Sequence, residues 1–241
     1  MDEKTITELN AINRNFYAIT ATEFDQTRGT AWQGWQDLPS YISVDDDSPL
    51  QVLDVGCGNG RFGVFLAEQL QRPIHYHGID NSDKLLDFAR NTLSAYPHLT
   101  AQIEHQDIVE NPPDEQQYDL VVLFGVIHHI PGFEHRQQFI KLLAERVKQG
   151  GLLVFAAWRF YDFDRFKKRL VTWDDELIEQ VEKHDYLLDW RRGEVALRYC
   201  HYVDDDEHQA LIEATELETI NTYRADGFTG TVNQYSVLKR V

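Results

Sequence analysis

Cysteine is nearly absent from this sequence, with only Cys57 and Cys200 among 241 residues. Two cysteines do not make a disulfide-based scaffold, and they fit a reducing compartment. No run of about 18 apolar residues occurs, so we expect no membrane-spanning helix. The first ten residues, MDEKTITELN, are acidic and polar rather than like a signal peptide, and we therefore expect a cytoplasmic protein.

Basic residues are also scarce: 23 Lys and Arg stand against 40 Asp and Glu, which gives a formal net charge of −17. Contacts from Lys and Arg drive binding to phosphate backbones, so this balance disfavours a nonspecific nucleic-acid coat. It leaves room for a local basic patch. The 12% of aromatic residues excludes a disordered chain.

What the sequence does contain, from residue 51 to residue 158, is an alternation of short apolar segments with helical patterns. The apolar segments are QVLDVG, HYHGID, AQIEHQD, YDLVVLF and LLVFAAW. This alternation predicts an α/β fold with a doubly wound, mostly parallel sheet. Helical spacing of apolar residues over 2–27 predicts an N-terminal helix before it.

After Trp158 the alternation breaks. Residues 159–192 have the charged, aromatic composition of a helical insertion, and 194–203 have that of a strand. Two final strands, LETINTYRA and TVNQYSVLKR, predict an antiparallel edge. We expect one domain in four parts: a helical cap (1–48), a cofactor-binding core (49–158), a lid-like insertion (159–193) and C-terminal strands that complete the sheet (194–241).

The densest motif is VLDVGCGNGRFG, at 52–63, where an apolar strand runs through closely spaced glycines into a helix. Glycines there let the backbone approach a ligand. Asp54 precedes the turn and would repel a pyrophosphate, while Asp80 and Asp107 end the next two strands. Three acids at successive strand ends favour a cationic nucleoside without phosphate over a dinucleotide, and S-adenosylmethionine is such a ligand.

VLDVGCGNG, HGIDNS, HQDI and YDLVVLFGVIHHIPG occur in the order and at the spacing of class I S-adenosylmethionine-dependent methyltransferases, which residues 51–157 resemble. The resemblance implies a seven-stranded sheet of order 3-2-1-4-5-7-6. It also implies that Asp54 binds the ammonium group of the cofactor and that Asp80 binds its ribose. The full set of implied cofactor contacts is Asp54, Gly56, Gly58, Asp80, Asn81, Asp107, Ile108, Phe124 and Gly125.

Short segments elsewhere resemble the tRNA methyltransferases that esterify 5-carboxymethyluridine at the wobble position. They are a Thr-Arg pair with two tryptophans, Ile-His-His after the fourth strand, a tryptophan after the fifth, and LRYCHYV at 197–203, where Cys200 replaces a tyrosine. This resemblance implies a tRNA substrate and a small activator protein as partner. Substrate contacts would come from Trp32, Trp35, His129, Trp158, Arg198, Tyr199 and His201.

A carboxylate acceptor is ionised at neutral pH and needs no general base, but it does need positioning by an arginine fork. Arg28 and Arg198 are candidates, one for the acceptor and one for the methionine carboxylate of the cofactor; ordinary salt bridges are the alternative. His128 and His129 are candidates for catalytic bases or pocket walls. His75 and His77 alternate along a strand, and no cluster of acids or cysteines accompanies them that would complete a set of metal ligands. We therefore expect no metal site there.

The segment RFYDFDRFKKR, at 159–169, has five basic residues between aromatic rings, as nucleic-acid sites often do. Its phenylalanines recur every third residue, which also fits a lid helix. We therefore consider three functions: a methyltransferase of a tRNA carboxylate, a methyltransferase of a small carboxylic acid or other metabolite, and a non-catalytic partner subunit. The intact glycine turn and its acids argue against the third.

Overall fold

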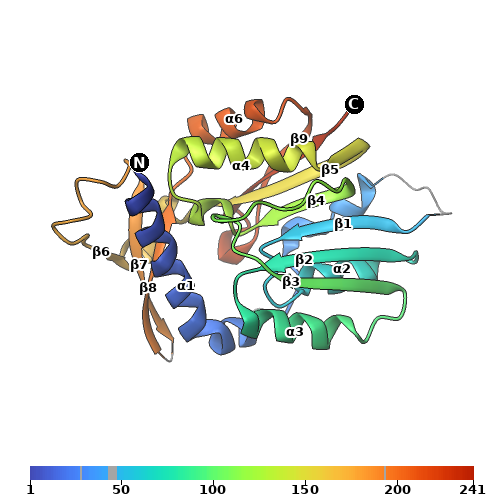
Figure 1. Cartoon of the computed structure of the whole chain (residues 1–241), viewed down its shortest axis with the longest axis horizontal. Helices are drawn as coiled ribbons and strands as arrows, with labels where there is room; N and C mark the ends of the chain where they lie inside the picture. Colours follow the sequence, from blue (N-terminus) through green and yellow to red (C-terminus); the bar gives the residue numbers. More distant parts are fainter. Residues whose placement is uncertain (28, 43–47, 193) are drawn as a thin grey trace.

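The central sheet has seven strands in the order β3-β2-β1-β4-β5-β10-β9 (Figure 1). A computed structural model describes residues 1–27, 29–42, 48–192 and 194–241. Strands β1 to β5 pair in parallel and β10 runs antiparallel to both its neighbours, so the predicted fold class and strand order are confirmed. The strands are β1 (Leu50–Val55), β2 (Ile74–Asp80), β3 (Leu99–His105), β4 (Tyr118–Phe124), β5 (Val147–Trp158), β9 (Glu218–Ala225) and β10 (Asn233–Lys239).

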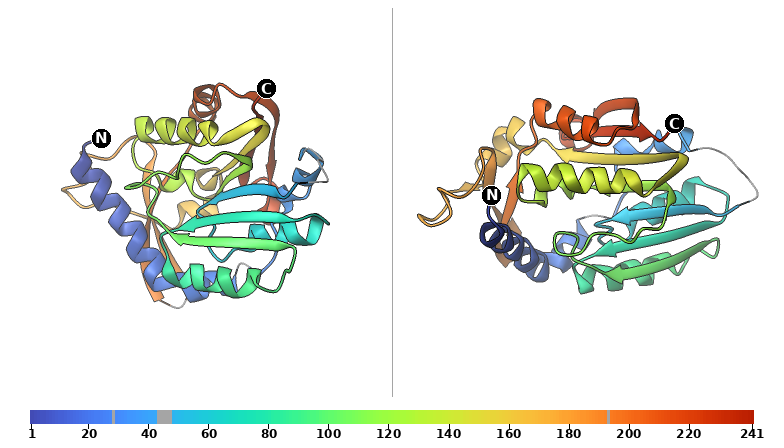
Figure 2. Two further views of the ribbon diagram at one scale, coloured as in Figure 1. Left: turned by 45° about the vertical axis from the view of Figure 1, so that its right-hand side comes forward. Right: turned by 45° about the horizontal axis from the view of Figure 1, so that its top comes forward.

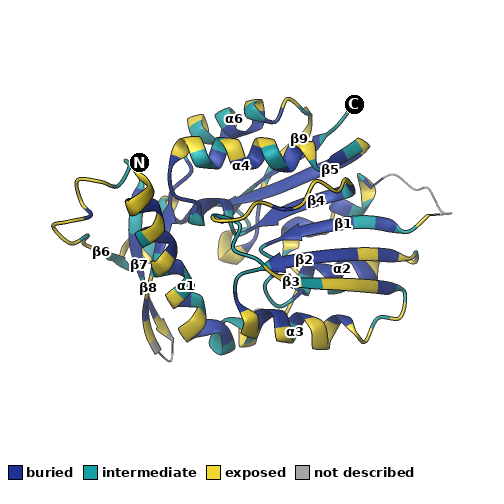
Figure 3. Ribbon diagram, in the orientation of Figure 1, coloured by how far each residue is buried: buried dark blue, intermediate teal, exposed yellow. Residues whose placement is uncertain are grey.

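Helices cover both faces of this sheet, as Figure 2 shows. One apolar core lies between the sheet and the helices α2 (Arg61–Gln69) and α3 (Asp83–Leu93). The other lies under α4 (Phe133–Glu145) and α6 (Asp205–Ala214). The inner strands are buried on both faces, whereas β3 at the edge is largely exposed (Figure 3).

The helix α1 (Glu3–Gln26) confirms the predicted N-terminal helix. It packs against α3 and the strand β8 (Glu194–His201), and the arrowheads of β1 to β4 point toward it (Figure 1). The carboxyl ends of parallel strands are the usual ligand-binding edge of such sheets. In the part of the chain that the structure describes, no helix combines the length and apolar character needed to cross a bilayer.

The prediction of a helical insertion was wrong. The region contains a 3-10 turn, η4 (Phe160–Asp162), a four-residue helix, α5 (Asp164–Lys167), and two strands, β6 (Leu170–Val171) and β7 (Asp185–Arg192). These strands join β8 in a separate antiparallel sheet, so β8 is a strand as predicted but does not complete the main sheet.

The charged stretch before β7 begins as a helical turn that does not extend into a helix. Asp174 accepts from the backbone N–H groups of Glu176 and Leu177, as an N-cap does, and its carbonyl accepts from Ile178 N. The Trp173 indole donates to the Asp185 carbonyl at the start of β7. The pairing of β7 with β8 then satisfies the backbone of the following segment.

Candidate active site

A cavity of about 490 Å³ opens at the carboxyl ends of β1 to β5. Its floor comes from the strand ends, and one wall comes from α1 through Asn10, Asn13 and Tyr17. Its far end is bounded by the small sheet, by the segment around α5 and by the turn between β9 and β10. The cavity therefore joins the predicted cofactor motifs to parts of the chain far away in sequence.

The glycine turn leaves β1 with three residues in left-handed backbone conformation: Gly56 at φ 74°, Gly58 at φ 53° and Gly60 at φ 76°. A Cβ on Gly56 would come within 2.2 Å of Val126 Cγ2, so that position tolerates no side chain. A Cβ on Gly58 would meet no atom within 4 Å. The backbone at Gly58 thus faces open cavity, as a cradle for the methionine part of a cofactor requires.

Asp54 lies beside this turn with only 2% of its surface exposed, and it accepts a hydrogen bond from the Tyr76 hydroxyl. Burial raises the pKa of Asp54 to about 7, although the Tyr76 bond opposes the shift. A buried carboxyl group that lines the cavity fits the binding of an ammonium group.

Cofactor affinity should therefore depend on Asp54 ionisation. Below pH 7 the free protein holds a proton on Asp54 that an ammonium ligand would displace, so we expect affinity for S-adenosylmethionine to fall roughly tenfold per pH unit between pH 7 and 5.5. Calorimetric titration over this range measures the slope. Asp54→Asn should bind more weakly and lose the slope; an equal slope in both proteins would contradict this role.

Asp80 ends β2, with one carboxylate oxygen accepting from Gly58 N at 2.9 Å and the other from Ser82 N at 2.9 Å. These bonds fix the carboxylate, and each oxygen keeps a second acceptor position. Burial raises the pKa of Asp80, and the backbone bonds oppose this. Asp80 and Asn81 both line the cavity, where such an acid suits ribose hydroxyls.

Asp107 anchors α1 across the cofactor end of the cavity. Its carboxylate accepts from Asn10 Nδ2 at 3.1 and 3.2 Å, from Arg14 at 3.1 Å and from the Val109 N–H at 3.1 Å. Asp107 and Ile108 also line the cavity. A contact with adenine stays a prediction, and any such contact would share Asp107 with α1.

Aromatic rings surround the end of β4. Gly125, at φ 75°, lies against Trp32, because a Cβ there would be 3.2 Å from that ring. Trp35 is 2% exposed and packs against Phe62 and Phe124 with ring centroids 5.2 and 5.5 Å apart. Both tryptophans line the cavity, so Trp35 serves packing and lining together.

His129, in the short helix η3 (Ile127–His129), is held as one tautomer. Its Nδ1 lies 2.9 Å from the Tyr199 carbonyl, which only accepts, so Nδ1 carries the proton. Nε2 then accepts from the Tyr17 hydroxyl at 3.1 Å. Burial, reinforced by the charge of Arg198, lowers the pKa of His129 to about 3. The ring is neutral, and its lone pair is already used.

His128 lies beside it, 3% exposed, with the pKa of its imidazole far below the ordinary value because of burial and the nearby His129 and Arg198. Its Nδ1 is buried and has no hydrogen-bond partner. His128 therefore lines the cavity as a neutral ring with unused hydrogen-bonding capacity.

Arg198 is the central cation of the far end. Its guanidinium lies over the rings of Trp158, at 4.6 Å, and Phe16, at 5.2 Å. No carboxylate of the described chain forms an ion pair with it, and its buried Nε has no hydrogen-bond partner. Arg198 and Trp158 line the cavity, so a guanidinium held by two rings presents its N–H groups there.

Tyr199 and His201 do not line this cavity, and the substrate contacts predicted for them stay predictions. Neighbouring residues of a strand face opposite sides, so their side chains leave β8 away from Arg198. The Tyr199 hydroxyl donates to Asp185 at 2.8 Å, and His201 bonds to Asp185 at 2.7 Å and Glu207 at 2.6 Å. Tyr199 contributes to the site only through its backbone.

These residues belong to a buried charged network around Arg136, which is fully buried on α4. Arg136 contacts Glu207 at 2.6 Å, Glu182 at 3.0 Å and His201 at 3.1 Å. Burial lowers the pKa of His201, but its bonds to Asp185 and Glu207 outweigh this and raise it above the ordinary value. The network ties β7 and β8 to α4 and α6.

Among the residues that the structure describes, two groups of side chains have the proximity of metal ligands: His128, His129 and Cys200, and Glu182, Asp185 and His201. In the first, Nδ1 of His129 bonds to a carbonyl and burial raises the pKa of Cys200 to about 12, so two ligands would first have to lose protons. In the second, Arg136 and hydrogen bonds already balance the carboxylates. Neither group is arranged to favour a cation.

Arg28 lies outside the described residues, so its two predicted roles stay predictions. Sequence reasoning missed the roles of Asn13, Tyr17 and Asp226. Asn13 accepts from Tyr199 N at 3.0 Å, and Asp226 accepts from Gly34 N at 2.8 Å and Tyr235 Oη at 2.6 Å. Asn10 and Asn13 could have been found, because polar residues on the otherwise apolar face of a predicted helix indicate a specific contact. No local pattern in the sequence indicates the role of Asp226.

A methyltransferase-domain family model matches residues 53–153. The chain is 25% identical over 195 residues to a mouse protein named probable tRNA methyltransferase 9B, covering 80% of this chain and 36% of the relative. It is 28% identical over 143 residues to the Saccharomyces cerevisiae tRNA (carboxymethyluridine(34)-5-O)-methyltransferase, covering 59% and 46%. The chain thus spans less than half of these curated relatives.

Solved structures share the fold. A methyltransferase from Clostridium acetobutylicum has a TM-score of 0.64 at 17% identity, covering 92% of this chain and 98% of that one. The magnesium protoporphyrin IX methyltransferase of Synechocystis has a TM-score of 0.63 at 17% identity, covering 99% and 100%. With the glycine turn and its three acids, these findings support a class I S-adenosylmethionine-dependent methyltransferase domain, whose family model matches residues 53–153 and whose fold the solved structures share. S-adenosylmethionine is the cofactor that fits the open backbone at Gly58 and the buried Asp54.

Proposed function

We propose that this methyltransferase esterifies a carboxylate, with Arg198 as the residue that holds the acceptor. The observation that carries the proposal is the guanidinium of Arg198, which has no carboxylate partner in the described chain although acids outnumber bases 40 to 23. An uncompensated cation in a cavity wall is stabilised when an anionic ligand arrives.

The reaction needs no proton transfer. The cofactor supplies a methyl group on a sulfonium; a carboxylate oxygen attacks it, the C–O bond forms, and the C–S electrons return to sulfur. Arg198 would hold the carboxylate, while Tyr17, His129 and Trp158 exclude water from the charges that disappear. This fits a His129 whose lone pair is engaged and whose proton faces a carbonyl.

His129→Asn should therefore retain most activity. Asparagine preserves a donor for the Tyr199 carbonyl, and we expect kcat to fall less than tenfold, whereas loss of a general base costs about 10²–10⁴. At saturating S-adenosylmethionine, kcat should also show no titration between pH 6 and 8, because the pKa of His129 lies near 3. A larger loss in kcat with a base-type pH profile would assign His129 proton transfer.

We further propose that the acceptor is a uridine-derived carboxylate in tRNA, such as 5-carboxymethyluridine, with a small activator protein and a cytoplasmic setting. Support comes from the scattered segments that resemble this subfamily and from the names of two relatives. The net charge of −17 favours the alternative, a small carboxylic acid.

Transfer of radiolabelled methyl from S-adenosylmethionine separates the two acceptors. We expect label in total tRNA, lost on mild alkaline hydrolysis as an ester requires. Label confined to a small-molecule extract would support the alternative. Calorimetry with S-adenosylmethionine alone is the control: a protein that does not bind it would fit the partner-subunit function instead.

A further inference from the structure

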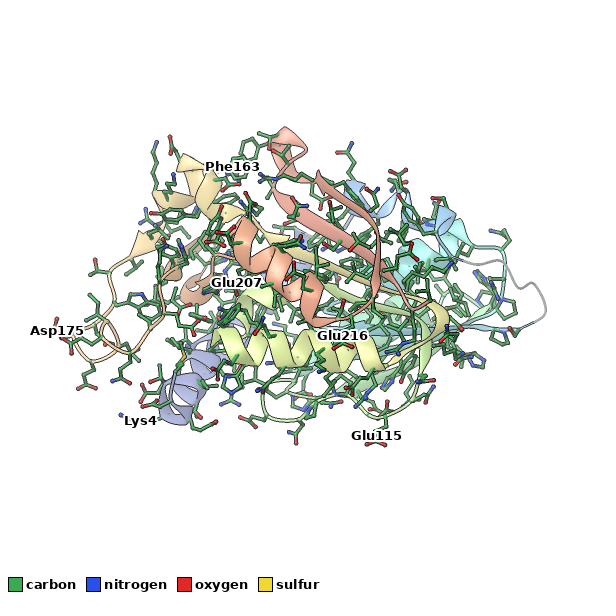
Figure 4. The ribbon with its side chains drawn as sticks, turned by 90° about the horizontal axis from the view of Figure 1, so that it is seen from above. Lys4, Glu115, Phe163, Asp175, Glu207 and Glu216 are labelled. Carbon is green, nitrogen blue, oxygen red and sulfur yellow. The ribbon has the colours of Figure 1, made fainter. Side chains whose placement is uncertain are left out.

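A second arginine stands at the mouth of the cavity. Arg165, on α5, has its guanidinium 4.4 Å from the ring centre of Phe228 and 4.7 Å from that of Phe166. Phe228 belongs to the turn between β9 and β10 and is 59% exposed, which is unusual for phenylalanine. Figure 4 shows the segment that carries Phe163 beside this turn, where Phe163 packs on Phe228 at 5.5 Å.

The acids around Arg165 are committed to other groups. Asp162 pairs with Arg159 and Arg224, and Asp164 lies 3.8 Å from Lys167. Asp226 accepts from the backbone N–H of Gly34 and from the side chains of Asn233 and Tyr235. Within the described ranges, no carboxylate forms an ion pair with Arg165. Its charge is thus left facing the cavity that it lines.

Two rings connect this arginine to Arg198. Phe166, which holds Arg165, lies 4.8 Å from Trp158, and Trp158 lies 4.6 Å from the Arg198 guanidinium. All four side chains line the same cavity. The wall therefore presents two uncompensated guanidiniums separated by aromatic surface, one deep and one at the mouth.

We propose that Arg165, Phe166 and Phe228 form a second anion subsite, which binds a phosphate group of the acceptor whose carboxylate is held by Arg198. This proposal rests on the proposed function. A guanidinium stacked between rings exposes its edge of N–H donors, which matches the oxygens of a phosphate. The exposed Phe228 ring offers a surface on which a planar group beside that phosphate can stack. A nucleoside monophosphate and a phosphodiester within RNA share this chemistry.

Calorimetric titration with inorganic phosphate tests the subsite without any assumption about the acceptor. We expect phosphate to bind the wild-type protein and Arg198→Ala, and to bind Arg165→Ala at least fivefold more weakly. Lys168→Ala, which removes an exposed charge of the same segment outside the cavity lining, should bind within twofold of wild type. Equal phosphate affinity in wild type and Arg165→Ala would overturn the proposal, as would loss in Arg198→Ala alone.

Acceptor kinetics then identify the source of the phosphate. We expect kcat/KM for 5-carboxymethyluridine 5′-monophosphate to exceed that for the nucleoside about tenfold in wild type, and Arg165→Ala to abolish this preference while retaining S-adenosylmethionine affinity. If the subsite serves RNA, the preference is larger for an anticodon stem-loop bearing the same nucleoside, and Arg165→Ala removes it there. An equal loss on nucleoside and nucleotide would overturn the subsite. If the wild type methylated none of the nucleoside, the nucleotide and the stem-loop, the proposed uridine acceptor would be refuted, and the phosphate titration would still decide the subsite.

Discussion

Replacing Arg198 with alanine should lower kcat/KM for the carboxylate acceptor by about a hundredfold or more. The variant loses charge-assisted hydrogen bonds to the carboxylate, which together contribute roughly 3 kcal/mol, and each 1.36 kcal/mol corresponds to a factor of ten. It also loses the orientation that the Trp158 and Phe16 rings give the guanidinium. Initial rates of methyl transfer at saturating S-adenosylmethionine measure the loss.

Two further variants make this result specific. Arg198→Lys keeps the charge but not the planar fork, so we expect it to recover only part of the activity. Arg191→Ala removes an arginine from the neighbouring strand whose side chain is 70% exposed, and it should leave the rate unchanged. Calorimetry should give equal cofactor affinity for wild type and Arg198→Ala. If Arg198→Ala retained full activity on a carboxylate, the acceptor would be held elsewhere.

The cofactor half of the molecule could be predicted from sequence because its constraints are local. Glycines at a strand-to-helix turn and acids at strand ends are recognisable in the sequence itself. Gly56, Gly58 and Asp80 line the cavity at the carboxyl ends of the strands, as that pattern predicts. The turn must have left-handed backbone, which favours glycine, and this requirement is visible in one short motif.

The acceptor half could be predicted only residue by residue. The sequence placed Arg198, Tyr199 and His201 together, whereas in the structure Arg198 lines the cavity and the other two side chains leave the opposite face of the strand. The insertion was misread because its charges suit a helix, whereas the pairing of β7 with β8 that makes it a sheet is not visible in any local pattern. Arg165 and Phe228 are 63 positions apart, and nothing local in the sequence brings them together.

The negative charge of the chain is distributed unevenly around the cavity. Asp54, Asp80 and Asp107 gather at the cofactor end, where a cation would bind, while in the described residues Arg165 and Arg198 form no ion pair with a carboxylate at the other end. Arg61 and Asp226 also line the cavity, so the separation of charge is partial. A chain with so many acids leaves an arginine uncompensated only where those acids are kept away, so the net charge of −17 sharpens the case for an anionic acceptor.

Replacing Arg136 with alanine should destabilise the protein by about 3–5 kcal/mol, because it leaves Glu182 and Glu207 without their cation in a buried site. For a domain of this size that corresponds to a fall in Tm of roughly 6–20 °C. Thermal unfolding followed by circular dichroism measures it. Lys141→Ala, on the exposed side of the same helix, is the matched control and should change Tm by less than about 2 °C.

The pH dependence of that loss distinguishes charge from packing. Burial raises the pKa of Glu207, but the His201 bond and the Arg136 charge outweigh burial and hold it below the ordinary value, so its stabilising contribution is present above about pH 4.5 and is lost as pH falls through the lowered pKa. The cost of Arg136→Ala should therefore be large at pH 7 and shrink toward pH 4, where the abandoned carboxylates take up protons. A cost that stays constant from pH 7 to 4 would show instead that Arg136 stabilises the protein by filling space.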